Sequence, residues 1–299
     1  MIYLKLEIKL KKEFFDMITK IENAVFSAEI KHDGAELHSL VKKDTGKEYI
    51  WYGRDEIWYG QSPILFPFIG KLLDDKYRYN GTEYSMQKHG FARKRPFELV
   101  SKEDTKAVFF QTFDEDTLAM YPFKFELYVT FELDNEGLKV SHTVKNIDDK
   151  KMYFSLGAHP GFNIEIGDSI IFDEKETLVT ERIDSNAIIA VFDEPLLDDA
   201  QEVIVTKDIF VEDALILNGF KSKGLTLKSQ SGEEILHFDM GDAPFLGIWA
   251  KPGAPYVCIE PWWGVNDTYE IKNDVSEKRG IQSLEAGEVF EYAWKAEIK

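Results

Sequence analysis

The sequence contains a single cysteine, Cys258, so it cannot close an intrachain disulfide or build a thiolate metal cluster. This scarcity indicates a reducing, cytoplasmic setting. No apolar run approaches the ~20 residues that a membrane-spanning helix needs, and the longest candidates lie at residues 63–70 and 187–192. The first residues also lack the continuous apolar segment of a signal peptide, because charge recurs at Lys5, Glu7, Lys9 and Lys11. We therefore expect a soluble protein that stays in the cytoplasm and has no membrane partner.

Basic residues are also scarce relative to acidic ones. Lys and Arg total 36 against 54 Asp and Glu, which gives a net charge of −18 and a pI near 4.8. Such a surface repels phosphate backbones, so nucleic acid is a poor partner. The sequence lacks a glycine-rich phosphate loop and a Walker lysine motif, and we expect neither cofactor nor metal. The composition is that of a globular protein, with 44% hydrophobic residues. A chain of this length can bury a core that is stable without disulfides or structural metals.

Two-residue alternation of apolar and polar side chains dominates the chain and predicts strands. Residues 125–133 alternate, residues 134–137 (Asp-Asn-Glu-Gly) form a turn, and residues 138–144 alternate again, which predicts a β-hairpin. Further strands are predicted at Phe26–Ile30, Glu36–Lys42, Ala107–Phe113, Met152–Gly157, Leu225–Gln230, Phe245–Ala250, Tyr256–Glu260 and Val289–Lys295. The fold class is therefore all-β, a large antiparallel β-sandwich.

Few windows have helical spacing, and the best are Glu13–Ile21 and Asp114–Met120. The acidic stretch Asp193–Asp199 is interpreted as a solvated loop. Residues 2–10 alternate like a strand, but Met17 is a second plausible start, so residues 1–16 are an N-terminal extension of uncertain role. Without a linker or an internal repeat, residues 17–299 are predicted to form a single domain.

Two of the six histidines stand at positions suited to acid–base chemistry. His89 precedes Gly90, which permits close backbone approach to a ligand. His159 follows an apolar strand and precedes Pro160, which cannot continue a central strand. Glu260 likewise ends the apolar strand at residues 256–259, where burial would raise its pKa. Trp262 and Trp263 follow it and offer flat faces that suit the C–H surface of a sugar, although tryptophans are more often core residues.

The remaining histidines give weaker signals. His32 and His38 are interpreted as surface residues, because their spacing matches no helical metal motif. His142 falls on the apolar face of the predicted hairpin and is interpreted as a core or cleft residue. His237 receives no role.

Several short motifs together resemble one known family. They are Ser62–Pro67 with Gly70-Lys71-Leu72, His89–Arg93, Gly157–Asn163, Phe210–Leu217 and Ile259–Trp262, and their order and spacing resemble the aldose 1-epimerase (galactose mutarotase) family, with LacX-type proteins as the nearest branch. The resemblance covers roughly residues 17–298. It implies the large galactose mutarotase-like supersandwich, with a sugar cleft across one sheet.

The resemblance also implies roles for individual residues. Glu260 would take the proton of the anomeric hydroxyl, and His159 would give a proton to the ring oxygen. His89 and Asp213 would bind and orient the sugar. Lys71 stands where the family more usually has arginine, which puts a bidentate contact in doubt. Arg93 is carried over as a substrate contact. The implied partner is a monosaccharide, and the protein would be a monomer or homodimer.

Interconverting sugar anomers requires a base and an acid at one carbon and neither metal nor covalent intermediate. Several alternatives stay open. A non-catalytic sugar-binding module would share the fold, and a hexose-6-phosphate epimerase could use Lys71, Lys88, Arg93, Lys94 and Arg95 as a basic pocket. A metal centre of His89, His159 and Glu260 lacks a short ligand pair, and a glycosidase would want two facing carboxylates.

Overall fold

The computed structural model describes residues 17–299, and the alternating residues 2–10 lie outside this range. Two kinds of sheet build the described chain. A small antiparallel sheet near the N-terminus has the strand order β1-β2-β3-β4, with strands β1 (Ile18–Glu22), β2 (Phe26–Lys31), β3 (Leu37–Lys42) and β4 (Lys47–Glu48).

The large sheet contains fifteen strands in the main order β5-β13-β21-β20-β17-β15-β18-β19-β23-β11-β10-β9-β8, with β14 paired to β21 and β16 to β15. Neighbouring strands are antiparallel throughout, so the all-β antiparallel prediction is confirmed. The strands are β5 (Ile64–Leu65), β8 (Glu98–Lys102), β9 (Lys106–Thr112), β10 (Phe125–Leu133), β11 (Gly137–Asn146), β13 (Leu156–Ala158), β14 (Gly161–Asn163), β15 (Ser169–Ile183), β16 (Ile189–Ile204), β17 (Leu215–Asn218), β18 (Gly224–Lys228), β19 (Glu234–Asp239), β20 (Phe245–Trp249), β21 (Tyr256–Trp263) and β23 (Val289–Ile298).

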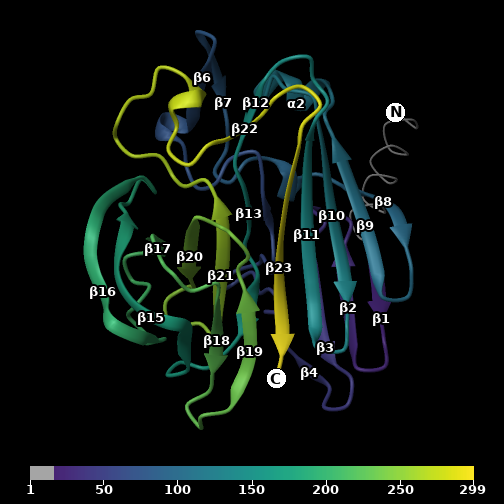
Figure 1. Ribbon diagram of the computed structural model, residues 1–299, viewed down its shortest axis with the longest axis vertical. Coiled ribbons are helices and arrows are strands. Elements are labelled where there is room, and N and C mark those ends of the chain that lie inside the picture. Colours follow the sequence, from purple (N-terminus) through teal and green to yellow (C-terminus); the bar gives the residue numbers. More distant parts are fainter. Residues whose placement is uncertain (1–16) are drawn as a thin grey trace.

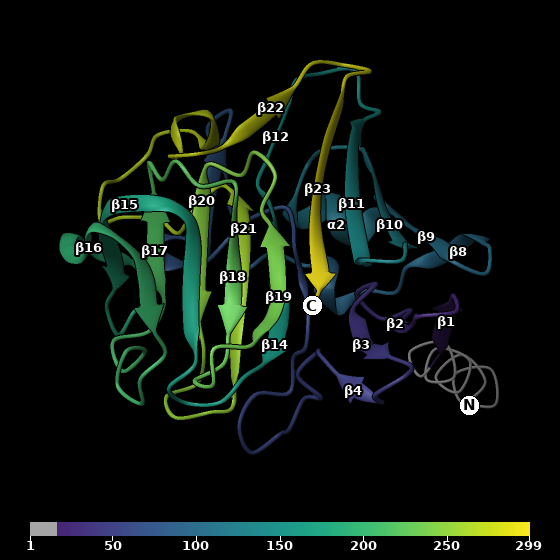
Figure 2. The same ribbon diagram turned by 60° about the horizontal axis from the view of Figure 1, so that its bottom comes forward.

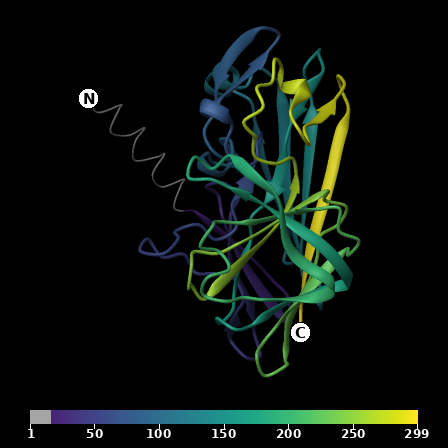
Figure 3. The same ribbon diagram turned by 90° about the vertical axis from the view of Figure 1, so that its left-hand side faces the viewer.

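Short elements complete the chain: the strand pairs β6 (Lys76–Tyr79) with β7 (Thr82–Ser85) and β12 (Met152–Phe154) with β22 (Gln282–Leu284), helix α2 (Glu115–Met120), and the 3₁₀ turns η1 (Leu73–Asp75), η2 (Ala92–Lys94) and η3 (Val275–Glu277). The small sheet lies against the β8–β11 part of the large sheet, where β1 and β2 contact β9 and β10 (Figures 1 and 2). The β15–β16 ribbon, at the left of Figure 1, faces the viewer in Figure 3. Among the described residues, no helix is long and apolar enough to cross a membrane.

The predicted hairpin is confirmed, and its register follows the alternation of the sequence. Strand β10 pairs with β11, so that Val129 lies opposite His142 and Leu133 opposite Leu138. Helix α2 is confirmed as well and begins with a capping box, in which Asp114 accepts from the Thr117 amide and donates its own amide to the Thr117 hydroxyl.

Two local predictions are wrong. Residues 18–21 of the predicted helix Glu13–Ile21 lie in strand β1, because Thr19 and Ile21 face the interior at two-residue spacing. The acidic stretch Asp193–Asp199 lies in strand β16 and not in a loop. That strand lies at the sheet edge and its register against β15 is irregular, so charged side chains can face solvent on it.

The half of the large sheet around β21 is covered on both faces. Along β17, Leu215 and Leu217 join the main core, whereas Ile216 joins a second apolar cluster that includes Trp262. Strands covered on both faces are continuous apolar runs, as seen in β21, where Tyr256 to Trp262 are all buried. A polar side chain on such a strand is therefore unusual, and Glu260 is one.

Candidate active site

Strand register brings His159 beside Glu260. Gly157 of β13 lies opposite Trp262, and Gly161 of β14 lies opposite Cys258. The two residues at the break between β13 and β14 therefore stand opposite Ile259 and Glu260 of β21. Pro160 causes the break because it has no amide hydrogen, and its carbonyl still accepts from the Ile259 amide at 3.1 Å.

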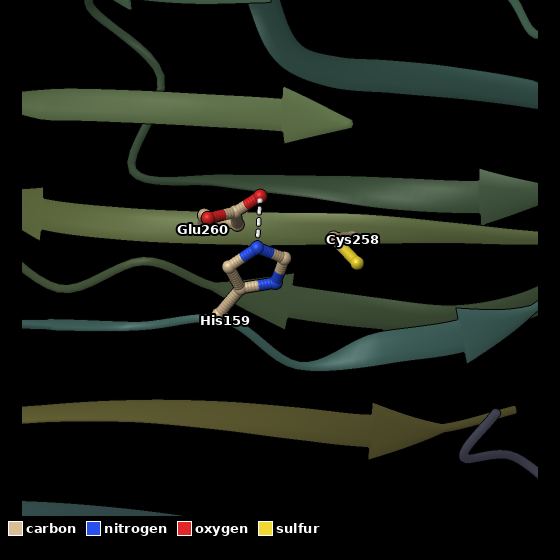
Figure 4. A group of neighbouring side chains, drawn as sticks. All are labelled: His159, Cys258 and Glu260. Carbon is tan, nitrogen blue, oxygen red and sulfur yellow. Dashed lines mark ion pairs between the residues drawn. The ribbon is translucent and has the colours of Figure 1, made fainter. Parts of the chain in front are cut away.

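The two side chains meet in the resulting site. His159 Nε2 lies 3.2 Å from Glu260 Oε1, and both side chains are buried (Figure 4). Burial, together with the positive charges of Arg93 and Lys88, lowers the pKa of His159 to about 3. Burial also raises the pKa of Glu260 well above its ordinary value. The dry surrounding therefore favours the uncharged form of the pair, in which the two groups share one proton and it lies on Glu260.

Cys258 is a third donor near this pair. It projects from the same strand as Glu260, and donor atoms of His159, Cys258 and Glu260 all lie within 4.8 Å of one another (Figure 4). A divalent cation would need the thiolate form of Cys258 as a ligand. Burial raises the pKa of the Cys258 thiol well above its ordinary value, so the group is a neutral thiol and is not a nucleophile.

His89 faces the same space from the segment before Gly90. Its Nδ1 accepts a hydrogen bond from the Gly70 amide at 3.1 Å, and its own amide donates to the Gly70 carbonyl at 2.8 Å. Burial, with the charges of Arg93 and Lys88, lowers the pKa of His89 well below its ordinary value. The neutral ring must then carry its proton on Nε2, which makes it a hydrogen-bond donor. Its ring centroid lies 6.0 Å from that of His159.

A cavity of about 170 Å³ surrounds these groups. The apolar part of its lining consists of Trp58, Ile183, Ala214, Ile216, Trp249 and Trp262. The polar part consists of Lys88, His89, Arg93, His159, Asp213, Glu260 and Asn266. Such a lining suits a small molecule that has hydroxyl groups and an apolar face. Arg93 is half-buried, and its Nη2 donates to the Lys88 carbonyl at 3.0 Å, which ties the two cations together.

Asp213 enters the cavity from a strained turn before β17. Its φ is 64°, in the left-handed region, and its Oδ1 accepts from the Ala214 amide at 2.7 Å. The buried Arg182 holds this turn in place. Its Nη1 donates to the Asp213 carbonyl at 3.2 Å, while its other nitrogens bind Glu194 at 2.9 and 3.2 Å. The β15–β16 ribbon thereby fixes the position of Asp213.

The structure brings five of the six predicted site residues together: His159, Glu260, His89, Asp213 and Arg93. Lys71 is not among the cavity residues. Its ammonium group lies 3.7 Å from the Asp75 carboxylate, as a surface pair. The prediction that Lys71 contacts a ligand is therefore not supported by its position.

Sequence reasoning missed the lining residues Trp58, Trp249 and Asn266, and it named Lys88 only as part of a basic pocket for a phosphorylated sugar. Of the two tryptophans after Glu260, Trp262 lines the cavity, whereas Trp263 packs on Phe290 at 5.0 Å. This difference follows from strand alternation, because Glu260 and Trp262 share one face of β21. The two-residue spacing from Glu260 was therefore the sequence signal that distinguishes the cavity residue Trp262 from Trp263.

The other histidines differ in burial. His32 is buried, 2.8 Å from the Thr19 hydroxyl, so its surface interpretation is wrong. His38 is half-buried, and its Nδ1 contacts Gln61. His142 is buried and stacks on Tyr292 at 5.9 Å, as expected for a core residue. His237 lies 3.0 Å from Asp173.

Comparisons with known proteins identify the family and the fold of the chain. The sequence model of the family described as aldose 1-epimerase matches residues 17–294. The plasmid-encoded protein LacX of Lactococcus lactis subsp. lactis is 29% identical over 284 residues, which cover 90% of this chain and 95% of LacX. A crystal structure of a galactose mutarotase-like protein from Lactobacillus casei has a TM-score of 0.90 and 33% identity, covering 95% of this chain and all of that chain. A galactose mutarotase related enzyme from Lactobacillus acidophilus has a TM-score of 0.90 and 31% identity, covering 95% and 97%.

Proposed function

The chain belongs to the aldose 1-epimerase family, and from this premise we propose that it interconverts the α and β anomers of a free hexose, with Glu260 and His159 as the acid–base pair. The observation that carries the proposal is the contact of 3.2 Å between His159 Nε2 and Glu260 Oε1 inside a small polar and aromatic cavity. A base and an acid at one carbon are what reversible opening of a hemiacetal needs.

The protons balance through one cycle. Transfer of the shared proton from Glu260 to His159 gives a carboxylate and an imidazolium. Glu260 then takes the proton of the anomeric hydroxyl while His159 donates to the ring oxygen, and the C1–O5 bond breaks to leave an aldehyde. Rotation about C1–C2 and reversal of both transfers form the other anomer and regenerate the pair.

Burial favours the uncharged form of the pair, which is present both in the resting state and after ring opening, over the ion pair formed between them. After ring opening, Glu260 is protonated and His159 is neutral, which is the uncharged form that a dry cavity stabilises. The other polar groups would bind hydroxyls: His89 through its Nε2 proton, and Asp213 as an acceptor. Each proton transfer supplies about 10²–10⁴ in rate, and orientation by these contacts supplies more.

Polarimetry of a freshly dissolved pure anomer tests the proposal. The wild-type protein should speed its approach to the equilibrium rotation, and Glu260→Gln should lower kcat by about 10²–10⁴ while sugar binding is kept. Glu126→Gln provides a matched control, because Glu126 lies far from the cavity on β10 and pairs with Lys145.

Two outcomes would contradict the proposal. A wild-type protein that leaves the rate of rotation unchanged but binds the sugar would indicate a non-catalytic sugar-binding module. A Glu260→Gln variant at the wild-type rate would remove Glu260 from the chemistry.

A second candidate is a hexose-6-phosphate epimerase, which Lys88 and Arg93 favour because both line the cavity. The other predicted basic residues are engaged elsewhere: Lys94 donates to Gln87 and Arg95 pairs with Asp114. Comparing kcat/KM for glucose or galactose with that for the 6-phosphate decides between the two candidates. A gain with the phosphate that Lys88→Met abolishes would favour the phosphorylated substrate.

A further inference from the structure

Trp58 lines the cavity from the loop between β4 and β5, and the proton transfers described above give it no role. Its indole stacks on the imidazole of His159, with ring centroids 5.0 Å apart and an interplanar angle of 28°. Trp249 meets both rings edge-on, at 5.5 Å from Trp58 and 5.8 Å from His159. With Glu260 bonded to Nε2, the imidazole is thus confined from three sides.

The loop that carries Trp58 is fastened to the segment that carries His159. At one end the Trp51 amide donates to the Gly161 carbonyl at 2.9 Å, and at the other the Gly161 amide donates to the Gln61 carbonyl at 2.7 Å. Between these ends, the Trp51 indole and the Arg54 amide both donate to the Trp58 carbonyl, at 2.8 and 2.9 Å. Because Gly161 follows His159 by two residues, the backbone hydrogen bonds of Gly161 hold the Trp58 loop next to the segment that carries His159.

Two glycines leave the space that the indole fills. A Cβ atom at Gly60 would lie 2.6 Å from Cζ2 of Trp58, and one at Gly161 would lie 3.0 Å from Cζ3. Both distances are too short for van der Waals contact, so a side chain at either position would move the indole. Glycine at positions 60 and 161 therefore leaves room for the Trp58 indole, and a larger residue at either position would not fit beside it.

We propose that Trp58 is a positioning residue for the epimerase reaction, which holds the plane of the His159 imidazole and keeps water away from it. The inference rests on the proposed function, because it assigns a task to a neighbour of the proposed acid. A general acid must point at the oxygen that it protonates, and a displacement of about 1 Å can cost 10²-fold in rate. A rigid aromatic plane supplies that constraint with few rotatable bonds.

Removing the indole should also change the titration of His159. Burial is the largest cause of the low pKa of His159, and Trp58 provides part of that burial. Water admitted in its place would raise the pKa toward the ordinary value for histidine. The charged and titratable groups that face His159 stay in place in a Trp58 variant: Glu260 and the Cys258 thiol on β21, and Lys88, His89 and Arg93 on the opposite segment.

The test compares Trp58→Ala with Trp58→Phe, and Tyr52→Leu serves as control because Tyr52 is exposed on the same loop. We expect Trp58→Ala to lower kcat by about 10- to 100-fold with a smaller change in KM. In ¹⁵N-histidine NMR spectra, the pKa of His159 should rise. Trp58→Phe should restore both quantities to within about threefold of wild type, since a stacked ring remains.

Gly60→Ala provides a second perturbation, because it retains the Trp58 indole but pushes it out of its position. If it lowers kcat while the NMR titration of His159 shifts, the indole acts through its position. Unchanged kcat and unchanged titration in a folded Trp58→Ala protein would overturn the inference. If instead the wild-type protein shows no epimerase activity, the proposed function fails, while the NMR titration still reports whether Trp58 shields His159.

Discussion

Protonation of the buried His142 should destabilise the protein in acid. Its ring stacks on Tyr292 between β11 and β23, outside the lining of the candidate active site, and burial lowers its pKa to about 4 from an ordinary value of 6.5. The unfolded chain takes up this proton near pH 6.5, whereas the folded chain does so only near pH 4. The stability that His142 contributes is therefore present above pH 6.5 and is lost as the pH falls toward 4.

The magnitude follows from the difference of the two pKa values. At 1.36 kcal/mol for each pKa unit, the loss amounts to about 3 kcal/mol. Burial also lowers the pKa of His32, His89 and His159, so the effect of His142 is isolated by comparison with His142→Phe, which keeps a stacked ring and removes the titration. Phenylalanine can shift the whole stability curve, because the space beside the ring is only about 10 Å³, but the pH-dependent difference remains.

Urea unfolding at a series of pH values from 4 to 7.5 measures this difference. We expect the free energy of unfolding of the wild type to fall by about 3 kcal/mol more than that of His142→Phe across this range. His237→Phe is the control, because His237 is only half-buried on β19. Parallel pH curves for the wild type and His142→Phe would refute the reasoning.

Two more predictions concern buried cations. Arg182→Met should raise KM by roughly tenfold at little cost in kcat, because the carbonyl of Asp213 loses its donor. An unchanged KM would show that the Asp213 turn keeps its conformation without Arg182. Lys175→Met, which removes an exposed cation, is the control. Asp267→Ala should lower the free energy of unfolding by about 3–5 kcal/mol, because the buried Lys278 ammonium, 2.5 Å from Asp267, loses its charge partner. Urea unfolding measures this loss. The double variant Asp267→Ala, Lys278→Met should recover most of the lost stability, because no unpaired charge stays buried. An Asp267→Ala variant as stable as the wild type would contradict the reasoning.

Local alternation predicted much of the fold, because each strand of a half-buried sheet records its two faces in its own sequence. The hairpin of β10 and β11 is the plainest example. Alternation was a poorer guide where tertiary contacts decide. Residues 18–21 have an ambiguous pattern that the pairing with β2 resolves, and the acidic stretch of β16 is held as a strand by β15.

The candidate site was visible as separate strand ends, but its assembly was not. His159 and Glu260 are 101 positions apart, and only the pairing of β13 and β14 with β21 shows that they lie opposite each other. Lys71 and Lys88 could not be ranked from sequence, since a long flexible side chain near a site can point to either side of the backbone. Trp58 gave no local signal, because its role depends on a loop that packs on the strand beside His159.

The position of β23 in the large sheet has a consequence for biosynthesis. β23 lies between β19 and β11 and joins the two halves of the large sheet, as Figure 1 shows. While residues 289–298 are still within the ribosome, β19 and β11 are open edges that can pair with other nascent chains. Pairing of β23 closes both edges at once, so a chain truncated before residue 289 should be insoluble rather than fold as a shorter protein.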